Sequence, residues 1–353
     1  MRRRRTITII ACVLAVIAAI TLAVYLRGKA APEPARLLPD GDAFIYVNLK
    51  PLHRAGVIGN KAPTNMDPDY AEFVKETGFQ FERDLDEAAF AVHMPVPTDA
   101  GMPPAYPYPR FSEVFVGHFN TDKVTTYFRK ISGNTERYRD VEIFSIPLQG
   151  RTVRIALLGL GTAAVSNTEG PLVIHGMIDR YKEIALPFGG PDLVQKHYHD
   201  IPFGTLAWSI ARVSPSRSGQ SNGLPILPGG FDLPFPGGTV IVASVRWAGN
   251  VHVKAEAFTA SEVEAKNVTD QANMALDLYR NLSTMQLQTA DPEVTSFIDS
   301  LKVEQEKNRA VLTATVPENF LKKILEEPPV GQAPLVQEEQ PKAEPKAAPR
   351  KRK

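Results

Sequence analysis

Residues 112–130, SEVFVGHFNTDKVTTYFRK, combine a strand pattern, a helix cap and a helix pattern in one short run. The first part is rich in valine and phenylalanine, which favour strands, and predicts a strand over Glu113–Phe119. Thr121 is a suitable helix cap, so we expect a helix from Asp122 onward. This run therefore indicates a strand that is followed directly by a helix.

The same order of elements recurs twice. Residues 250–267 predict a strand over Val251–Phe258, and Ser261 and Glu264 follow at the spacing of a capping box. Residues 309–327 predict a strand over Ala310–Val316, and Pro317 opens a helix that runs to about Glu326. The recurrence predicts a duplicated α+β fold in which helices pack on one face of antiparallel sheets. We expect two similar lobes, at residues 41–190 and 191–327.

Neighbouring segments supply the antiparallel partners that these strands need. VEIFSIP, TVRIALLGL and TAAVSN predict one ladder, and LAWSIARV with TVIVASVRW predicts a second. The run LKVEQEKNRAVLTATV predicts a hairpin with its turn at residues 306–308. Between the strands, residues 68–77 predict a helix with Asp67 as N-cap and Gly78 as its stop, and residues 261–287 predict the longest helix.

The N-terminus predicts a membrane anchor. Arg2–Arg5 are followed by Thr6–Leu26, which carry no charge, and about 20 apolar residues suffice to cross a bilayer as a helix. The excess of positive charge before residue 6 places the N-terminus in the cytoplasm and the rest of the chain in the periplasm or outside the cell. Residues 27–40 are expected to form a linker between the inner membrane and the fold. We thus expect a single-pass protein of the inner membrane.

Two other interpretations of the N-terminus stay open. Ala30 and Ala31 offer small residues at which a secretory signal is cleaved, although the apolar run is longer than such signals need. Cys12 resembles the cysteine of a lipoprotein box, but the apolar run continues past it, whereas such a box ends the run. Cys12 is the only cysteine of the chain, so the ectodomain contains no disulfide bond.

Charge argues against a nucleic-acid partner. Residues 31–327 carry 28 basic and 36 acidic side chains, a net charge of −8, whereas nucleic-acid readers present a basic surface. Residues 328–353 are rich in Pro, Glu and Lys without apolar periodicity and predict a disordered tail. Its end, residues 350–353 (RKRK), serves either to contact anionic lipid headgroups or to keep the chain soluble.

Three short patterns resemble chemical sites. The run GLGTAA at residues 159–164 fits a dinucleotide loop, but a strand rather than a helix is expected to follow it, which favours a hairpin turn. The run KHYHD at residues 196–200 places His197 and His199 on one face of a strand, as in zinc sites, but no third ligand has suitable spacing. Asp84 and Asp86, with Glu82 and Glu87 close by, are typical of a solvated turn before a strand. We therefore assign no catalytic residue, no cofactor-binding residue and no metal ligand.

Residues 214–238, SPSRSGQSNGLPILPGGFDLPFPGG, form an unusually long loop with apolar side chains among prolines and glycines. Loops of this length in compact domains often carry function. This loop either contacts an envelope protein or the membrane surface, or it packs on its own domain.

Three stretches resemble a family of uncharacterised bacterial membrane-anchored proteins that is classed as a domain of unknown function. They are LLPDGDAFIYVNLKPL (37–52), TGFQFERDLDEAAFAV (77–92) and VFVGHFNTDKVTTYF (114–128). The resemblance covers residues 37–185 and, more weakly, residues 310–326. It implies one transmembrane helix and a duplicated α+β ectodomain, and it implies no reaction and no functional residue.

These observations favour a non-catalytic binding or scaffolding module of the cell envelope. The alternatives are a periplasmic hydrolase or metal-dependent enzyme whose residues meet only in the fold, and a carrier of lipid or another small ligand. The sequence alone names no ligand, partner or oligomeric state.

Overall fold

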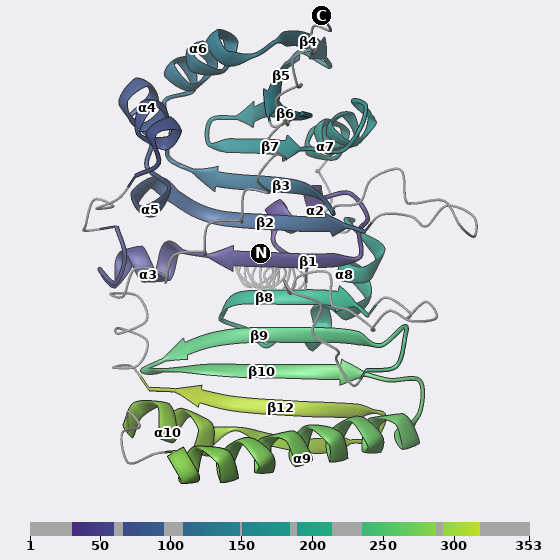
Figure 1. Ribbon diagram of the computed structural model, residues 1–353. Coiled ribbons are helices and arrows are strands. Elements are labelled where there is room, and N and C mark those ends of the chain that lie inside the picture. Colours follow the sequence, from purple (N-terminus) through teal and green to yellow (C-terminus); the bar gives the residue numbers. More distant parts are fainter. Residues whose placement is uncertain are drawn as a thin grey trace, which may run out of the picture.

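The described strands form one continuous antiparallel sheet. The computed structural model describes residues 30–59, 66–94, 109–148, 150–183, 189–213, 235–286 and 292–317. The sheet has twelve strands in the order β11-β12-β10-β9-β8-β1-β2-β3-β7-β6-β5-β4, and it is seen face-on in Figure 1. The strands are β1 (Ala43–Asn48), β2 (Leu85–His93), β3 (Arg110–Gly117), β4 (Asn134–Tyr138), β5 (Val141–Leu148), β6 (Arg151–Gly159), β7 (Thr162–Ser166), β8 (Thr205–Arg212), β9 (Val240–Ala248), β10 (Asn250–Phe258), β11 (Lys302–Glu306) and β12 (Arg309–Val316). The predicted α+β class with antiparallel strands is confirmed.

The strands of the two expected lobes join in the middle of this sheet. β1 pairs with β8, and this pair places Phe44 opposite Ile210 and Tyr46 opposite Trp208. The Tyr46 and Trp208 rings stack with centroids 5.5 Å apart. Phe44 and Ile210 are fully buried, so the seam between the two groups of strands lies inside the main hydrophobic core.

The helices lie on both faces of the sheet, whereas the sequence predicted one face. They are α2 (Glu33–Leu37), α3 (Lys50–Arg54), α4 (Pro68–Thr77), α5 (Phe81–Asp84), α6 (Thr121–Ile131), α7 (Leu172–Glu183), α8 (Asp192–His197), α9 (Glu262–Gln286) and α10 (Pro292–Ser300), with the 3₁₀ turn η1 (Tyr198–Asp200). Residues of α2, α7 and α8 pack in one core cluster with Phe44 and Tyr46, on what we call the Tyr46 face.

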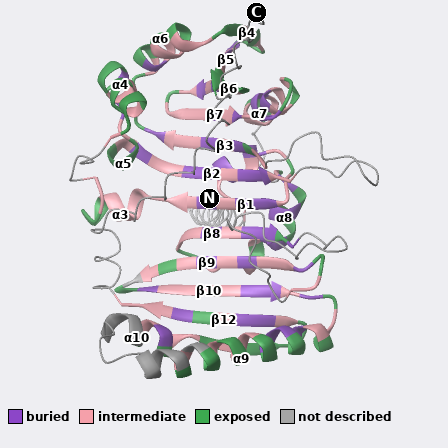
Figure 2. Ribbon diagram, in the orientation of Figure 1, coloured by how far each residue is buried: buried purple, intermediate pink, exposed green. Residues whose placement is uncertain are grey.

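The opposite face, which we call the Phe90 face, carries α4, α5, α6, α9 and α10. Figure 1 shows α4, α5 and α6 at the upper end of the sheet and α9 and α10 at the lower end. Phe73 of α4 packs with Phe79 and Phe90, and Val268 of α9 packs with Ala257 of β10. The strands in the middle of the sheet are buried or half-buried, and exposed residues gather on the outer sides of α6 and α9 (Figure 2).

Local capping signals predicted the helix ends well. The N–H of Asp69 donates to the Asp67 carboxylate, and Gly78 ends α4 in the left-handed conformation with φ 77°. The predicted capping box opens α9, because Glu264 N–H donates to Ser261 Oγ at 3.2 Å and the Glu264 carboxylate accepts from Ala260 N–H at 3.0 Å.

Two local predictions need correction. Asn120, not Thr121, caps α6, because its side chain accepts the N–H of Lys123 at 3.0 Å. The expected linker 27–40 contains α2, whose Ala35 and Leu37 are fully buried, as is Leu38 just beyond it. This segment belongs to the core because the sheet has an apolar face that it covers.

Candidate functional site

The carboxylates at residues 82–87 each have a separate partner and do not form one acidic cluster. Glu82 accepts the Tyr70 hydroxyl at 2.7 Å, and Asp86 lies 3.6 Å from His118 Nδ1. Glu87 accepts the Tyr46 hydroxyl at 2.8 Å and contacts Lys50. The predicted solvated turn is therefore wrong, and these side chains hold the ends of β1 and β2 against α3, α4 and α5.

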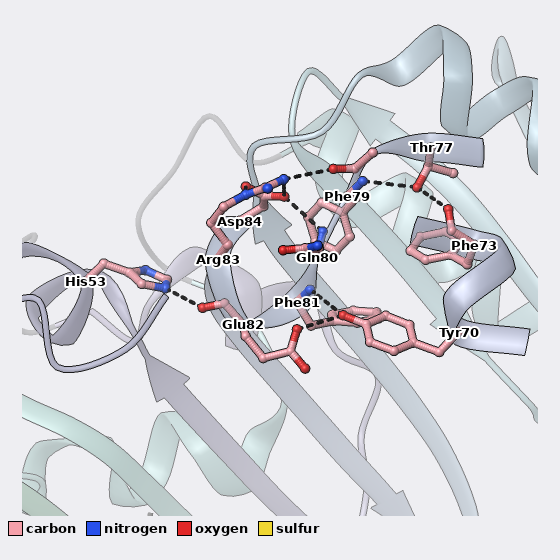
Figure 3. Close-up of polar contacts among 11 residues, drawn as sticks. His53, Tyr70, Phe73, Thr77, Phe79, Gln80, Phe81, Glu82, Arg83 and Asp84 are labelled. Atoms are coloured by element: carbon pink, nitrogen blue, oxygen red, sulfur yellow. Dashed lines mark hydrogen bonds and ion pairs between the residues drawn. The ribbon is translucent and has the colours of Figure 1, made fainter. Parts of the chain in front are cut away.

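The segment that carries α5 is fixed by a network of hydrogen bonds, which Figure 3 shows. Asp84 is the centre of one half, because its carboxylate accepts Gln80 N–H at 2.9 Å and Arg83 Nε–H at 2.7 Å. Arg83 also donates to the carbonyl of Gly78. In the other half the Tyr70 hydroxyl accepts Phe81 N–H at 3.0 Å while it donates to Glu82. α5 has only four residues, and these side chains supply the order that so short a helix lacks.

The same network holds the ring of Phe81 in place at the surface. Phe81 is 38% exposed. Its ring centroid lies 5.1 Å from that of Phe79, 5.7 Å from Tyr70 and 5.9 Å from Phe115. Edge contacts at such distances are favourable and fix ring orientation. Phe81 is thus an exposed aromatic residue that stands on a rigid aromatic base.

Aromatic side chains continue from Phe81 across the sheet. The rings of Phe115 and Phe90 meet edge-on at 5.7 Å. In β3 and β2, Phe111 is paired with Val92 and Phe115 with Ala88, and both phenylalanines lie on the Phe90 face. Phe111 is 36% exposed. We call the set Phe81, Phe90, Phe111, Glu113 and Phe115 the aromatic surface.

Glu113 is the one charged member of this surface. It is half-buried in the middle of β3, opposite Phe90 on one side and Val165 on the other. Among the described residues it has no hydrogen-bond or ion-pair partner, and burial raises the pKa of its carboxyl group. A lone carboxylate among apolar side chains reduces stability, so we examined it as a candidate functional group.

We expect replacement of Glu113 by glutamine to stabilise the protein at neutral pH by about 1 kcal/mol, because it removes a desolvated charge. Since the folded state raises the pKa of Glu113, it binds the proton more tightly than the unfolded state does. Ionisation therefore costs stability as the pH rises from the unfolded pKa, about 4.3, through the folded pKa. Urea unfolding across this range measures the difference, which should vanish at acid pH. A Glu113→Gln variant that is less stable than wild type at neutral pH contradicts this assignment.

The histidine pair suggested by the sequence does not form a metal site in the part of the chain that the structure describes. Residues 192–197 form α8 and residues 198–200 form η1, so His197 and His199 do not share a strand face. The His199 side chain is 73% exposed. His197 is buried, with Nδ1 3.5 Å from Asp200 but no hydrogen bond, and burial lowers its pKa. No group of three or more metal-ligating side chains occurs among the described residues.

The glycine pattern at residues 159–164 is a hairpin turn, as the sequence favoured. β6 ends at Gly159 and β7 begins at Thr162, with Leu160 97% exposed at the tip. The carbonyl of Gly161 accepts Gly117 N–H at 2.9 Å. A Cβ atom at Gly161, where φ is 148°, would lie 2.6 Å from the Gly117 carbonyl oxygen. Close packing of two backbones therefore explains this glycine.

One serine–histidine pair was missed by sequence reasoning. Ser112 Oγ lies 3.0 Å from His93 Nε2, and hydroxyl contacts continue to Ser166 at 3.4 Å and from there to Thr168 at 2.8 Å. Strand register alone brings these residues together, since Ser112 is paired with Ser166. Ser112 is fully buried, so its hydroxyl is not open to a substrate, and the chain of contacts satisfies polar groups inside the sheet.

Four predicted features fall outside the described residues. These are the proposed transmembrane helix at residues 6–26, the helix expected after Pro317, the tail expected at residues 328–353, and residues 214–234 of the apolar loop. At the end of that loop, Phe235 packs with Ile241 against the cluster of Ala257, Val268 and Ala310. No helix in the described ranges has the length and apolar character that a membrane crossing needs.

Comparison with known proteins gives only distant likenesses. No protein-family model matches the chain, and no curated protein matches it. Among solved structures, crystal form I of TP0453 is similar with a TM-score of 0.42 and 11% identity, over 84% of this chain and 98% of that chain. Crystal form III of TP0453 gives a TM-score of 0.41 and 9% identity, again over 84% and 98%. Likenesses this distant carry no implication for function.

Proposed function

We propose that this protein is a single-pass module of the cell envelope that binds a protein partner without catalysing a reaction. Residues 6–26 anchor it in the inner membrane, and the folded part lies on the far side from the cytoplasm. The aromatic surface is the contact region, and loop 214–238 is a second proposed contact. The exposure of Phe81 and Phe111, together with the rigid aromatic base under Phe81, is the observation that carries this proposal.

Physical argument favours a binding role for this surface. Exposed aromatic residues are enriched at protein interfaces, and a small number of aromatic anchors supplies most of the binding energy. A side chain that is already fixed before binding loses little conformational entropy on binding. Phe81 meets both conditions, because its ring packs on four aromatic neighbours and its backbone N–H donates to the Tyr70 hydroxyl.

The catalytic alternative has weaker support in the described residues. The Ser112–His93 contact is the observation that favours a hydrolase, but nucleophilic catalysis requires that the substrate reach the hydroxyl. Because Ser112 is fully buried, we do not propose hydrolysis.

Protease treatment of intact spheroplasts tests the anchored topology. We expect external protease to digest the folded part while the undigested protein keeps its full-length mass and stays with the membranes, because the four arginines retain the N-terminus inside. A soluble mature protein that is shorter by about 30 residues would show that the apolar stretch is a cleaved signal.

Loss of the exposed aromatic rings tests the contact surface. We expect the full-length Phe81→Ser/Phe111→Ser variant to lose at least about tenfold of its specific partner in quantitative co-purification from solubilised envelopes, since hot-spot aromatic residues contribute on this scale. Leu172→Ser is the matched control, because Leu172 is 81% exposed but lies in α7 on the opposite face. Equal retention of every partner by both variants opposes the proposal, provided that circular dichroism shows both to be folded.

A further inference from the structure

The surroundings of Glu113 specify the chemistry of what binds the aromatic surface. Phe111 and Phe115 are its next neighbours on the same face of β3, and Phe90 and Val165 are its partners in β2 and β7. Paired side chains in a sheet are about 5 Å apart, and those two residues apart along a strand are about 7 Å apart. Apolar side chains therefore surround the carboxylate on all four sides within the sheet.

Among the described residues, Glu113 has neither the cation nor the hydrogen-bond donor that a buried carboxylate needs. Within the described ranges no cation and no hydrogen-bond donor pairs with Glu113, whereas three other buried or half-buried acids of the molecule have such partners. Glu87 pairs with Lys50, Asp84 with Arg83, and Glu256 with Arg309. Glu113 thus differs from these acids because none of the described residues supplies its counter-charge.

We propose that Glu113 and the phenylalanines around it receive a cationic side chain, lysine or arginine, from the protein partner. The carboxylate neutralises the cation, the ring faces attract it, and the rings also pack against the apolar stem of the side chain. The bound segment presents the cation between apolar residues, because the surface on every side of Glu113 is apolar. This inference rests on the proposed function and names the feature that the contact surface selects.

Neutral polar groups and anions fit the site less well. A neutral hydrogen-bond donor leaves the carboxylate charge uncompensated in an apolar setting, and an anion adds repulsion. A cation has the opposite effect, because each partner replaces the water that the other loses. Glu113 is in this sense a selectivity group, and the phenylalanines supply most of the contact area.

A double-mutant cycle tests this inference directly. The protein is the full-length chain in neutral dodecyl maltoside micelles, and the probe is the peptide Leu-Val-Lys-Val-Leu-amide with carboxyfluorescein on its N-terminal amine. A second peptide has arginine and a third has norleucine in place of lysine. Norleucine keeps the apolar stem and lacks the charge. Fluorescence anisotropy then gives the affinity of each peptide for wild type and for Glu113→Gln.

For wild type we expect the lysine or the arginine peptide to bind about tenfold more tightly than the norleucine peptide, as coupled charges at a partly buried site do. In Glu113→Gln we expect this preference to disappear. Phe203→Ser is the control on the protein side, since Phe203 is 94% exposed and outside the aromatic surface, and it should keep the wild-type preference.

Several outcomes overturn the inference. The inference is wrong if Glu113→Gln keeps the preference for a cation. It is also wrong if wild type binds all three peptides equally or binds none of them. If Glu113→Gln keeps its partner in envelope co-purification while Phe81→Ser/Phe111→Ser loses it, the contact surface stands and only the charge selection fails. If all of these variants retain the partner, the proposed function itself fails.

Discussion

Replacement of Phe44 by alanine is expected to lower the free energy of unfolding by about 3–5 kcal/mol, the usual cost of removing a buried phenylalanine. Phe44 is fully buried, with an exposed fraction of 0%. It is paired with Ala91 in β2 and with Ile210 in β8, so the cavity would open at the seam that joins the two groups of strands. Urea unfolding of the full-length chain, followed by circular dichroism, measures the change.

The shape of that unfolding curve is informative as well. Because the sheet is continuous across the β1–β8 pair, we expect one cooperative transition that moves as a whole in Phe44→Ala. Phe203→Ala is the control, and it should change stability by no more than about 0.5 kcal/mol, since its side chain is 94% exposed. Two separate transitions, only one of them sensitive to Phe44, would mean that the groups of strands fold independently.

Replacement of Asp84 by alanine is expected to cost about 2 kcal/mol, because it removes three hydrogen bonds to a charged acceptor and leaves Gln80 N–H without its partner. Burial acts to raise the pKa of Asp84, but the hydrogen bonds from Arg83 and from Gln80 N–H outweigh it and hold the pKa below its usual range. The stabilisation is therefore present above the unfolded pKa, about 3.9, and is lost as the pH falls through the folded pKa.

Comparison with Arg83→Ala separates the contributions of the two partners of Asp84, which are Arg83 and Gln80 N–H. The Arg83 side chain is 51% exposed, so its loss should cost clearly less than the loss of Asp84, while Gln80 N–H keeps its acceptor. Urea unfolding of both variants at neutral pH and at about pH 2 measures this. Equal effects of the two variants, or an Asp84→Ala effect that is unchanged in acid, would show that Asp84 does not hold α5 in the way that Figure 3 indicates.

Sequence reasoning succeeded where the structure depends on near neighbours. The Asp67 cap, the Gly78 stop and the Ser261–Glu264 capping box each involve residues a few positions apart, and propensity and spacing describe such contacts well. The hairpin β11–β12 was predicted for the same reason. The antiparallel α+β class followed from these local units.

Sequence reasoning failed where contacts between distant segments determine the structure. α2 has five residues and contains Pro34, so it shows no helical periodicity, and only the apolar sheet face that it covers makes it part of the core. The β1–β8 pair joins residues more than 150 positions apart, and local patterns do not specify such a pairing. A single sheet was therefore not predicted.

The candidate site was missed for a similar reason. Glu113 falls at a strand position that usually faces solvent, and its surroundings depend on the register that sets it opposite Phe90 and Val165. In the sequence, Phe81 stands out only as part of residues 77–92, which resemble a family. Its role depends on rings from α4 and β3, which the sequence does not show to be neighbours. The unusual composition of residues 214–238 instead favoured that loop as the contact region.

The most direct test of the aromatic surface is photo-crosslinking in intact cells. The photoreactive amino acid p-benzoylphenylalanine replaces Phe81 or Phe111 in the full-length chain, and Leu172 in α7 serves as the control position because it is also well exposed. We predict that ultraviolet light produces the same crosslinked protein from positions 81 and 111 and does not produce it from position 172. Crosslinks that are absent at 81 and 111, or that form equally at 172, would contradict the assignment of this surface as the contact region.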